Sequence, residues 1–419
     1  MPCSGSSRCF SVPTNPSRDA EGARALACTF DPQRLTADFY ESPYATYAAL
    51  RAWDPVHRCA DGSYFLTRYA DLDQVYRDRV RFSSDKRAVF GPVFGVTSPL
   101  YSHHTTSLVF NDAPYHTRVR RPIVDALSPS VVRGLEASVT SLVDALLERL
   151  RDLRKFDLIE DFAARIPVEV IGNLLRVPHE DRGPLRGWSL AILGALEATT
   201  TAAQRQHGNE AVSEFTRYLR ELIGERRRHP GPDTDLLTGL LREKELSEDE
   251  LLQNCIFLLN AGHETTTNII GNGLHLLLRT PAAAQRLRED PPLAGSAIEE
   301  CLRLESPNQL GNRLVSEPVT IGGVALEAGT YLTLCIGAAN RDPEEFAQPD
   351  LFDITRKPNR HLAFAAGAHA CVGMGVARLE AQVALLRMLQ KLPELRLRGE
   401  GQRGARARFR GFVSLPAEI

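Results

Sequence analysis

Cys371 is the residue whose surroundings point most directly to chemistry. It stands between glycines in the stretch HLAFAAGAHACVGMG (residues 361–375), ahead of a helical pattern that runs to about Leu392. We predict that this helix begins at Cys371. A thiol at a helix N-terminus faces unpaired backbone N–H groups and the positive end of the helix dipole, so we expect its thiolate form to be favoured.

Three chemistries use such a thiolate: nucleophilic catalysis, a redox dithiol and metal ligation. A nucleophile needs a histidine base, and His369, two residues away, would not present its ring to the same sulfur. A redox pair lacks its second cysteine, and a tetrahedral zinc site lacks further cysteine or histidine ligands at suitable spacing. A single thiolate on a glycine-rich loop fits axial ligation of haem iron, because glycines let the backbone approach a flat macrocycle.

A second chemical patch lies in the middle of a predicted helix. Ser247 and Glu250 form a capping box, and helical spacing continues to Arg279, over roughly 48 Å at 1.5 Å per residue. The pattern is apolar nearly all round, which predicts a buried central helix. Its middle nevertheless reads AGHETT (261–266). The threonines could bond back to carbonyls one turn earlier and the glutamate could pair with a buried base, but a buried glutamate is costly and favours a functional role.

The remaining patterns predict a mainly α chain with small β-sheets, the α+β class. Residues 129–280 are almost wholly helical in pattern, whereas residues 87–109 are punctuated by glycine and proline and are predicted to be a loop. Glu300 and Arg303 share one face of a helix over 293–305, where such a pair is most often a surface salt bridge. Further predictions are a helix over 43–53, a hairpin over 56–67 turned at Asp61-Gly62, strands within 319–336 and a turn at 340–343.

Composition and charge narrow the partners. The chain has 419 residues, of which 43% are hydrophobic, and a formal net charge of -2, which gives no reason to expect nucleic acid or an anionic membrane as partner. Its apolar runs fall far short of the roughly 18 residues that span a bilayer, so we expect no membrane anchor.

The cysteines and the N-terminal segment bear on organisation and compartment. The eight cysteines have no CxxC spacing and most are expected to be buried, which favours the reducing cytoplasm as location. Residues 1–28 lack the apolar core of a signal peptide, and we expect them to be a largely disordered leader. Residues 29–419 are expected to form a single domain.

The cysteine loop resembles a known family. Its pattern Phe364-x-x-Gly367-x-His369-x-Cys371-x-Gly373 is similar to the haem-ligand loop of the cytochrome P450 monooxygenases. Further motifs fall in the order of that family: Asp112–Arg121 resembles its haem-propionate segment, Ala261–Thr265 its oxygen-activation motif, Glu300-x-x-Arg303 its ExxR, and Asn340–Pro343 a turn typical of it. The similarity covers roughly residues 30–419, and the chain most resembles soluble bacterial members.

The resemblance implies a fold in which a long central helix lies over the haem and the helix after the cysteine loop lies on its proximal side. Cys371 would be the metal ligand, the proximal thiolate of haem b, with Phe364 packed near the sulfur. Gly373 and Ala261 would also contact the ring. The propionates would be held by basic side chains, because cations pair with carboxylates. These would be His116, Arg120, Arg313 and His369.

The resemblance also assigns catalytic and structural residues. Glu264 and Thr265 would deliver protons, since cleavage of the O–O bond needs two protons at a dry site. Glu300 and Arg303 would form a buried network with Asn340-Arg341, so the salt bridge would be structural.

Two positions depart from the family pattern. Ala365 follows Phe364 where the family usually has glycine or another small or polar residue, which predicts steric difficulty in the loop. Asn260 stands just before Ala261, where the family commonly has an apolar side chain near substrate. A hydrogen bond within the helix bundle and a polar contact to substrate remain equal explanations for Asn260.

Apolar residues of the 87–109 segment and the central helix would line a cavity over the haem, with residues near the C-terminal turn closing it. The expected lining consists of Val89, Phe90, Phe94, Val96, Phe257, Asn260, Leu310, Phe412 and Val413. Such a lining favours a lipophilic substrate with one or two polar groups, although aromatic residues here could equally be ordinary core. His103 and His104 could form a second metal pair, but adjacent loop histidines are more often solvated, and we expect solvation.

Electrons from NAD(P)H must arrive from elsewhere, because we expect no room in 419 residues for a fused flavin or ferredoxin domain. By analogy with the family, a ferredoxin would dock on the proximal face by charge complementarity. The expected basic residues are Arg118, Arg121, Arg356, Lys357 and Arg360. A set of solvated surface arginines is the alternative. We expect the protein to act as a monomer.

The sequence therefore predicts a haem-thiolate monooxygenase that hydroxylates, or otherwise oxidises, a lipophilic small molecule with O2. A peroxide-driven peroxygenase of the same fold is one alternative, which Glu264 and Thr265 argue against because peroxide already brings the protons. A non-catalytic haem-binding sensor is another, and it would need no acid–alcohol pair. A dinucleotide-binding dehydrogenase is weakly supported, because 271–273 and 373–378 lack the third glycine and no strand precedes either.

Overall fold

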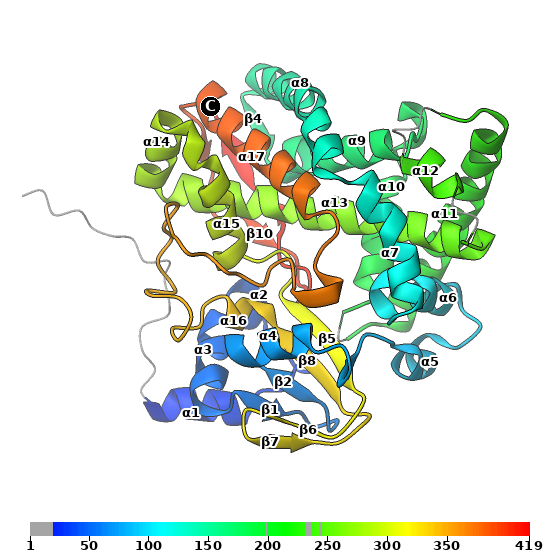
Figure 1. Ribbon diagram of the computed structural model, residues 1–419. Helices are drawn as coiled ribbons and strands as arrows, with labels where there is room; N and C mark the ends of the chain where they lie inside the picture. The colour runs from blue at the N-terminus through cyan, green and yellow to red at the C-terminus, as the bar shows by residue number, and fades with distance from the viewer. Residues whose placement is uncertain (1–19, 198, 232–235, 243–244) are drawn as a thin grey trace, which may run out of the picture.

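A long central helix organises the molecule (Figure 1). The computed structural model describes residues 20–197, 199–231, 236–242 and 245–419. Within them α13 (Glu248–Arg279) runs through the middle of a helical part, while the largest sheet lies in a smaller part together with the first helices. The arrangement confirms a mainly α chain with small β-sheets.

The capping box of α13 is present as predicted. The Ser247 side chain accepts a hydrogen bond from the backbone N–H of Glu250, and the Glu250 carboxylate accepts one from the backbone N–H of Ser247. Despite the length of α13, no helix in the described part of the chain is both long and apolar enough to cross a membrane. The other helices of this part are α8 (Pro129–Leu153), α9 (Arg165–Leu174), α10 (Leu185–Gly194), α11 (Ala202–Arg228), α12 (Leu236–Arg242), α14 (Pro281–Glu289), α15 (Ala294–Leu304) and α17 (Met374–Lys391).

The largest sheet has the strand order β1-β2-β8-β5-β3. Its strands are β1 (Val56–Arg58), β2 (Tyr64–Leu66), β3 (Phe82–Ser83), β5 (Leu310–Val315) and β8 (Tyr331–Cys335). The predicted hairpin is confirmed, since Val56 pairs antiparallel with Leu66 across a turn in which Gly62 has φ +83°. Strand β2 pairs in parallel with β8, which joins the N-terminal hairpin to the predicted strands of 319–336.

Short elements complete the fold. Small sheets contain β4 (Lys155–Asp157), β9 (Arg396–Leu397) and β12 (Pro416–Glu418); β6 (Val319–Ile321) and β7 (Val324–Leu326); and β10 (Gln402–Arg403) and β11 (Phe412–Ser414). The remaining α-helices are α1 (Ala20–Cys28), α2 (Ala37–Glu41), α3 (Tyr44–Trp53), α4 (Tyr69–Arg77), α5 (Arg87–Phe94), α6 (Pro99–Thr106), α7 (Tyr115–Ala126) and α16 (Ile336–Ala339). Single turns form η1 (Leu108–Phe110), the π-helical η2 (Ile159–Ala163), η3 (His179–Asp181), η4 (Pro291–Leu293) and η5 (Gly367–His369).

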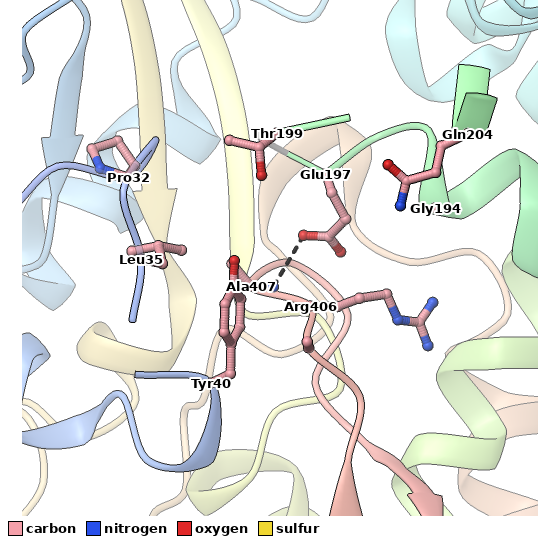
Figure 2. Close-up of a pocket in the computed structure, with 10 residues that line it drawn as sticks. Pro32, Leu35, Tyr40, Gly194, Glu197, Thr199, Gln204, Arg406 and Ala407 are labelled. Atoms are coloured by element: carbon pink, nitrogen blue, oxygen red, sulfur yellow. Dashed lines mark hydrogen bonds between the residues drawn. The ribbon is translucent and has the colours of Figure 1, made fainter. Parts of the chain in front are cut away.

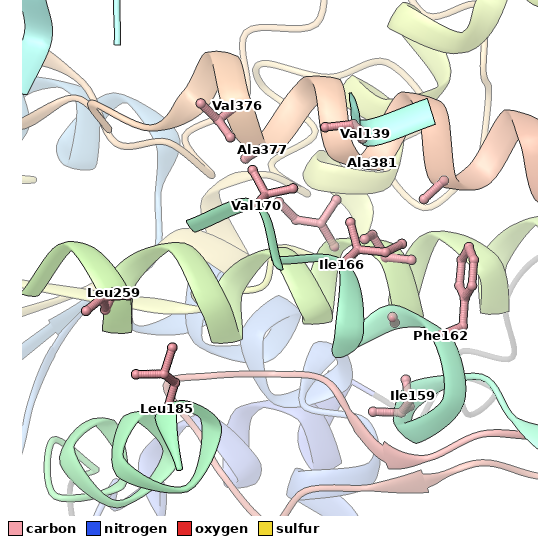
Figure 3. Close-up of a cluster of buried hydrophobic side chains, with 14 of the residues drawn as sticks. Val139, Ile159, Phe162, Ile166, Val170, Leu185, Leu259, Val376, Ala377 and Ala381 are labelled. Atoms are coloured by element: carbon pink, nitrogen blue, oxygen red, sulfur yellow. The ribbon is translucent and has the colours of Figure 1, made fainter. Parts of the chain in front are cut away.

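The main apolar cluster fixes α13 against its neighbours (Figure 3). Leu259 of α13 and Leu185 of α10 belong to it, as do Ile166 and Val170 of α9 and Ala381 of α17. Each fully buried side chain of leucine or isoleucine size contributes about 1.5–3 kcal/mol to folding. The same cluster therefore holds the helix that carries AGHETT and the helix that follows the cysteine loop.

The prediction of a loop over 87–109 was wrong. The segment forms α5, α6 and η1. Ser98 caps α6 by accepting a hydrogen bond from the N–H of Tyr101 at 3.1 Å, and Pro99 occupies the first turn, where its missing N–H costs nothing. Helices of eight residues are too short to display a clear apolar period, which is why the sequence did not reveal them.

Part of the expected leader is also ordered. Residues 20–28 form α1, whose Ala27 is fully buried against α3. The prediction of disorder was therefore wrong for these residues, because a short amphipathic helix was overlooked among the small and charged residues. Residues 1–19 lie outside the described part.

Candidate functional site

The cysteine loop is held by backbone hydrogen bonds. Cys371 donates its N–H to the carbonyl of Phe364 at 2.9 Å, and Arg120 donates from Nη2 to the carbonyl of Ala370 at 2.6 Å. Helix α17 begins at Met374, with Gly373 as its N-cap, so the predicted start at Cys371 was three residues too early. The sulfur nevertheless receives backbone N–H groups from Gly373 and Met374.

The ionisation of Cys371 differs from the prediction. Burial raises the pKa of the thiol, and the N–H groups of Gly373 and Met374, with Arg120 and Arg378, lower it by less. The protein by itself therefore favours the thiol, because burial outweighs the helix terminus. A directly bound metal cation would favour the thiolate, because it deprotonates a coordinated thiol.

Backbone strain is concentrated just before the cysteine. Gly367 has φ +68°, and a Cβ there would lie 2.3 Å from the carbonyl oxygen of Tyr76, so only glycine fits. Ala365 has φ +55°, in the left-handed region that L-residues with a Cβ disfavour. The steric difficulty predicted for Ala365 is confirmed.

Replacing Ala365 with glycine is expected to stabilise the protein by about 1 kcal/mol, because the side chain that disfavours the left-handed conformation is removed. Thermal denaturation of the holoprotein measures the change. Ala366→Gly is the matched control: Ala366 has φ -144°, where glycine gains nothing and only loosens the unfolded chain. A lower melting temperature in both variants would contradict the strain at Ala365.

Basic side chains gather beside the cysteine loop. The rings of His116 and His369 stack with centroids 4.0 Å apart, and neither Nε2 of His116 nor Nδ1 of His369 finds a hydrogen-bond partner among the described residues. Lys86, which is fully buried, donates to the carbonyl of Ser84 at 3.1 Å. The guanidinium of Arg313 lies over the ring of Tyr76.

These basic groups repel one another. Burial, followed by repulsion from Arg313 and His116, lowers the pKa of His369 to about 2. Burial and Arg313 likewise lower the pKa of Lys86 to about 7. The nearby Asp112 lies 4.0 Å from His369 but already accepts hydrogen bonds from the side chain of Ser83 and the N–H of Ser84.

Such a cluster fits a ligand that brings its own negative charges. Two carboxylates would accept hydrogen bonds from the unpaired histidine nitrogens and relieve the repulsion. The structure brings together all of the residues predicted for this role, His116, Arg120, Arg313 and His369, and adds Lys86. Sequence reasoning missed Lys86, because no motif marks it and its burial depends on distant segments.

One face of α13 is partly exposed. Phe257, Ala261 and Thr265 are partly exposed, although most of their neighbours on this helix are buried. They lie four residues apart and so share one face. The Thr265 hydroxyl donates to the carbonyl of Ala261 at 2.7 Å, so its oxygen remains free to accept a further hydrogen bond.

Glu264 lies next to this face and is buried. Its carboxylate forms an ion pair with Arg406, in the turn between β10 and β11. Burial raises the pKa of Glu264, and Arg406 partly offsets the increase. Arg406 is therefore a base that pairs with the buried glutamate, as one of the two explanations for Glu264 required. The pairing does not exclude an acid role, because the net direction favours the protonated form.

The chain is similar to known proteins along most of its length. The family model described as "Cytochrome P450" matches residues 196–401. A protein of Bacillus subtilis (strain 168) named "Biotin biosynthesis cytochrome P450" is 37% identical over 369 residues, which span 86% of this chain and 92% of that protein.

The chain belongs to the cytochrome P450 family. Members are oxidoreductases that incorporate oxygen from O2, and they use haem b and NAD(P)H through redox partners. The "Vitamin D(3) 25-hydroxylase" of Pseudonocardia autotrophica is 38% identical over 87% of this chain and 89% of that protein. The crystal structure of P450BioI in complex with a hexadec-9Z-enoic acid ligated acyl carrier protein has a TM-score of 0.88 at 35% identity, covering 92% of this chain and 100% of that chain. The cysteine loop and the basic cluster beside it thus form a site whose side chains fit a dianionic, metal-bearing group.

The predicted network of Glu300 and Arg303 is present and fully buried in this P450. Arg303 donates from Nε and Nη2 to the two carboxylate oxygens, at 2.8 Å each. Its Nη1 donates to the carbonyl of Asn340 at 2.9 Å, whereas Arg341 turns instead to the carbonyl of Leu304. The bond to Asn340 is confirmed, and the network of Glu300 and Arg303 reaches Arg341 only indirectly.

The residues predicted to line the substrate cavity of this P450 have different surroundings. Val96 and Val413 are 67% and 42% exposed. Leu310 and Phe412 belong to different apolar clusters. Phe90 and Phe94 pack in an aromatic group with Phe110 and His104, so the ordinary-core alternative describes them. Val89 is partly exposed on α5, and Phe257 lies on the accessible face of α13.

Three polar positions also depart from expectation. His103 and His104 are buried rather than solvated, and His103 Nδ1 lies 3.0 Å from Gln253 Oε1. The side-chain nitrogen and oxygen of Asn260 are both buried without a partner among the described residues. A hydrogen bond within the helix bundle therefore does not explain Asn260.

Two of the arginines predicted to bind a redox partner already form ion pairs within the chain. Arg118 forms a bidentate pair with Glu250, at 2.6 and 3.0 Å. Arg356 donates from Nε to both oxygens of Glu300 at 3.1 Å. The surface interpretation was wrong for Arg356, because the loop before the cysteine folds it back into the buried network. Lys357 and Arg360 are exposed as expected.

Proposed function

We propose that this P450 is a monooxygenase that inserts one oxygen atom of O2 into a lipophilic small molecule, with electrons from a separate ferredoxin and ferredoxin reductase. The observation that carries the proposal is the acid–alcohol pair Glu264 and Thr265, at the accessible face of an otherwise buried helix. Haem b bound through a cysteine thiolate supplies O2 binding and cleavage of the O–O bond. The residues of this chain supply placement, protons and exclusion of water.

The haem would be held from two sides. Cys371 would be the iron ligand, with Phe364 and Gly373 beside it in the loop and Ala261 on the opposite helix. The propionates would accept hydrogen bonds from the basic cluster, which supports the placement because its unpaired nitrogens need acceptors. The residues for this contact would be Lys86, His116, Arg120, Arg313 and His369.

Glu264 and Thr265 would supply the protons. Glu264 is buried and its raised pKa favours a carboxyl group that still carries its proton. The Thr265 hydroxyl, bonded back to Ala261, has a lone pair free to accept a proton from water or acid and pass on its own. The apolar residues around them exclude bulk water, which prevents unproductive proton leakage.

The substrate class is proposed from the accessible face and from relatives. Phe257 and Ala261 offer apolar surface, and the unpaired amide of Asn260 offers a polar contact one turn before Glu264. Similar proteins include one solved in complex with testosterone and another with myristic acid. These ligands share extensive apolar surface, which supports a lipophilic substrate for this chain. Lys357 and Arg360 are the exposed cations proposed to meet an acidic ferredoxin.

Product formation decides between oxygen and peroxide as the oxidant. Holoenzyme is supplied with a lipophile panel and either NAD(P)H, ferredoxin and reductase under O2, or hydrogen peroxide alone. The proposal expects product with the redox proteins and incorporation of label from 18O2. Turnover with peroxide only would show that the protein is a peroxygenase and not a monooxygenase. Absence of turnover in both arms would favour a haem-binding sensor.

Thr265→Ala tests the proton-delivery role. Product formation is expected to fall by about a hundredfold while NAD(P)H consumption continues, because the two electrons would then reduce O2, with two protons, to hydrogen peroxide instead of supporting oxygen insertion. The ratio of product to NAD(P)H is the measurement. Thr267→Ala is the control, since Thr267 bonds back to the carbonyl of His263 on the same helix but lies off the accessible face. If Thr265→Ala were as well coupled as the wild type, the assignment would be wrong.

A further inference from the structure

Arg406 connects the buried acid of α13 to the surface. It lies in the turn between β10 and β11, and its side chain is 21% exposed, whereas that of its partner Glu264 is 3% exposed. The residue lines two neighbouring clefts beneath the connection of α10 and α11. Figure 2 shows its guanidinium extending away from Glu197 and Tyr40, below Gly194.

Most of the donors of this guanidinium are unused. Its ion pair with Glu264 runs through Nη1 to one carboxylate oxygen, and within the described part of the chain no hydrogen bond involves Nε or Nη2. Several other arginines of the chain engage both oxygens of their carboxylates. The bidentate pairs include Arg118 with Glu250, Arg303 with Glu300, Arg378 with Glu299 and Arg387 with Asp144. Arg406 thus retains a fork that fits a second carboxylate.

The other acid near the clefts is already satisfied. Glu197 accepts hydrogen bonds from the backbone N–H groups of Ala407 and Arg408 at 3.0 Å each and of Phe409 at 3.4 Å. The bond to Ala407 is drawn in Figure 2. Because Glu197 is held by the backbone, it does not reach the guanidinium of Arg406. The free side of Arg406 faces the clefts, where a negatively charged ligand can reach it.

The larger cleft, of about 420 Å³, has walls suited to an apolar chain. Gly187, Leu190, Ala191 and Gly194 line it from one face of α10, at the spacing i, i+3, i+4 and i+7. A Cβ added to either glycine would meet no atom within 4 Å, so this helix face is open. The volume falls within the usual range of small-molecule sites, roughly 300–1,000 Å³.

We propose that Arg406 binds the carboxylate of the substrate, and that the substrates of this P450 are amphiphilic monocarboxylic acids whose apolar chain lies against α10. The inference rests on the proposed function and names its substrate class. Arg406 then serves two carboxylates, Glu264 and the substrate. The added negative charge, and the sharing of the guanidinium, both favour the protonated form of Glu264, so binding of an acid also prepares the proton donor.

Equilibrium binding to the holoenzyme tests the proposal. Calorimetry measures the Kd of tetradecanoate and of the isosteric neutral tetradecanamide, for the wild type and for Arg406→Gln. The wild type is expected to prefer the carboxylate by about 10- to 100-fold, the usual worth of a charged hydrogen-bonding contact. Arg406→Gln is expected to remove this preference and to leave amide binding unchanged.

Two controls keep the result interpretable. His207→Gln changes another polar residue of the same cleft and should leave the preference intact. Arg406→Gln combined with Glu264→Gln removes both charges of the buried ion pair, and so avoids an unpaired carboxylate if the single variant folds poorly. Only binding, not turnover, is measured for the double variant.

The outcomes separate this inference from the proposed function. Equal affinity of the wild type for acid and amide, or equal weakening of both by Arg406→Gln, would overturn the carboxylate site. Oxygenation of neutral lipophiles would survive that result. Conversely, a carboxylate preference lost in Arg406→Gln would stand even if no product formed with the redox proteins.

Discussion

Replacing Cys371 with serine is expected to abolish monooxygenase activity and to remove the thiolate signature from the Soret band of the reduced, CO-bound protein. As the proposed iron ligand, the Cys371 thiolate would supply the electron density that promotes O–O cleavage, and a serine oxygen is a much weaker donor. The contacts proposed for the propionates, through the basic cluster, would remain, so some haem is expected to stay bound. Spectroscopy and product formation are measured on the same preparation.

Cys59→Ser provides the matched control. Cys59 is buried in the N-terminal cluster and contacts Ser63, so a hydroxyl can replace the thiol there. Its spectrum and activity should match those of the wild type. A Cys371→Ser protein that kept the thiolate signature would show that another residue holds the iron.

The local motifs of this chain were predictable because their spacing carries the information. The capping box at Ser247 needs only residues of the same turn, and Glu300 and Arg303 meet on one helix face. The cysteine loop belongs to this group, and even the difficulty at Ala365 was visible as a departure from a pattern. A positive φ at one non-glycine position is the physical counterpart of that departure.

The contacts that sequence reasoning missed join distant segments. Arg356 and Glu300 are 56 residues apart in the sequence, and no periodic pattern predicts that they pair. Arg406 likewise comes from the C-terminal hairpin to meet an acid of α13. Lys86 is a polar residue in an ordinary polar stretch until the fold buries it. For these residues the local sequence favours exposure, and only tertiary packing decides otherwise.

The ionisation of Cys371 also depends on tertiary packing that the local sequence does not reveal. Position at a helix terminus predicted a favoured thiolate for Cys371, and the N–H groups do lower its pKa. Burial, which depends on the whole fold, outweighs them.

The second large effect is expected at Arg303. Arg303→Met should destabilise the holoprotein by about 3–5 kcal/mol, the usual cost of removing one partner from a buried ion pair. Besides Glu300, the guanidinium satisfies the carbonyls of Asn340 at 2.9 Å, Pro349 at 2.6 Å and Leu351 at 3.1 Å. All of them lose a donor in Arg303→Met, and the Asn340 residue is fully buried. Denaturation by urea, at fixed haem content, measures the change.

A pair of the same residue types and spacing elsewhere in the chain is the control. Glu148 and Arg151 lie at i and i+3 on α8, and Arg151 donates from Nη1 to both carboxylate oxygens, at 2.9 and 3.0 Å, but both side chains are exposed. Arg151→Met is expected to cost no more than about 1 kcal/mol, because solvent and side-chain entropy reduce the worth of a surface pair. Equal losses in the two variants would mean that burial adds nothing to the network.

The consequence of Arg303→Met should extend beyond stability, because its carbonyl partners precede the cysteine loop. The Asn340 side chain accepts the N–H of Leu362 at 2.7 Å, and Asn359 donates to Glu300 at 3.1 Å. Loss of the guanidinium therefore loosens the segment that places Cys371. We expect the fraction of protein with the thiolate signature to fall before global unfolding in Arg303→Met, and to fall together with unfolding in Arg151→Met. This order of events distinguishes a network that positions the thiolate from one that only adds stability.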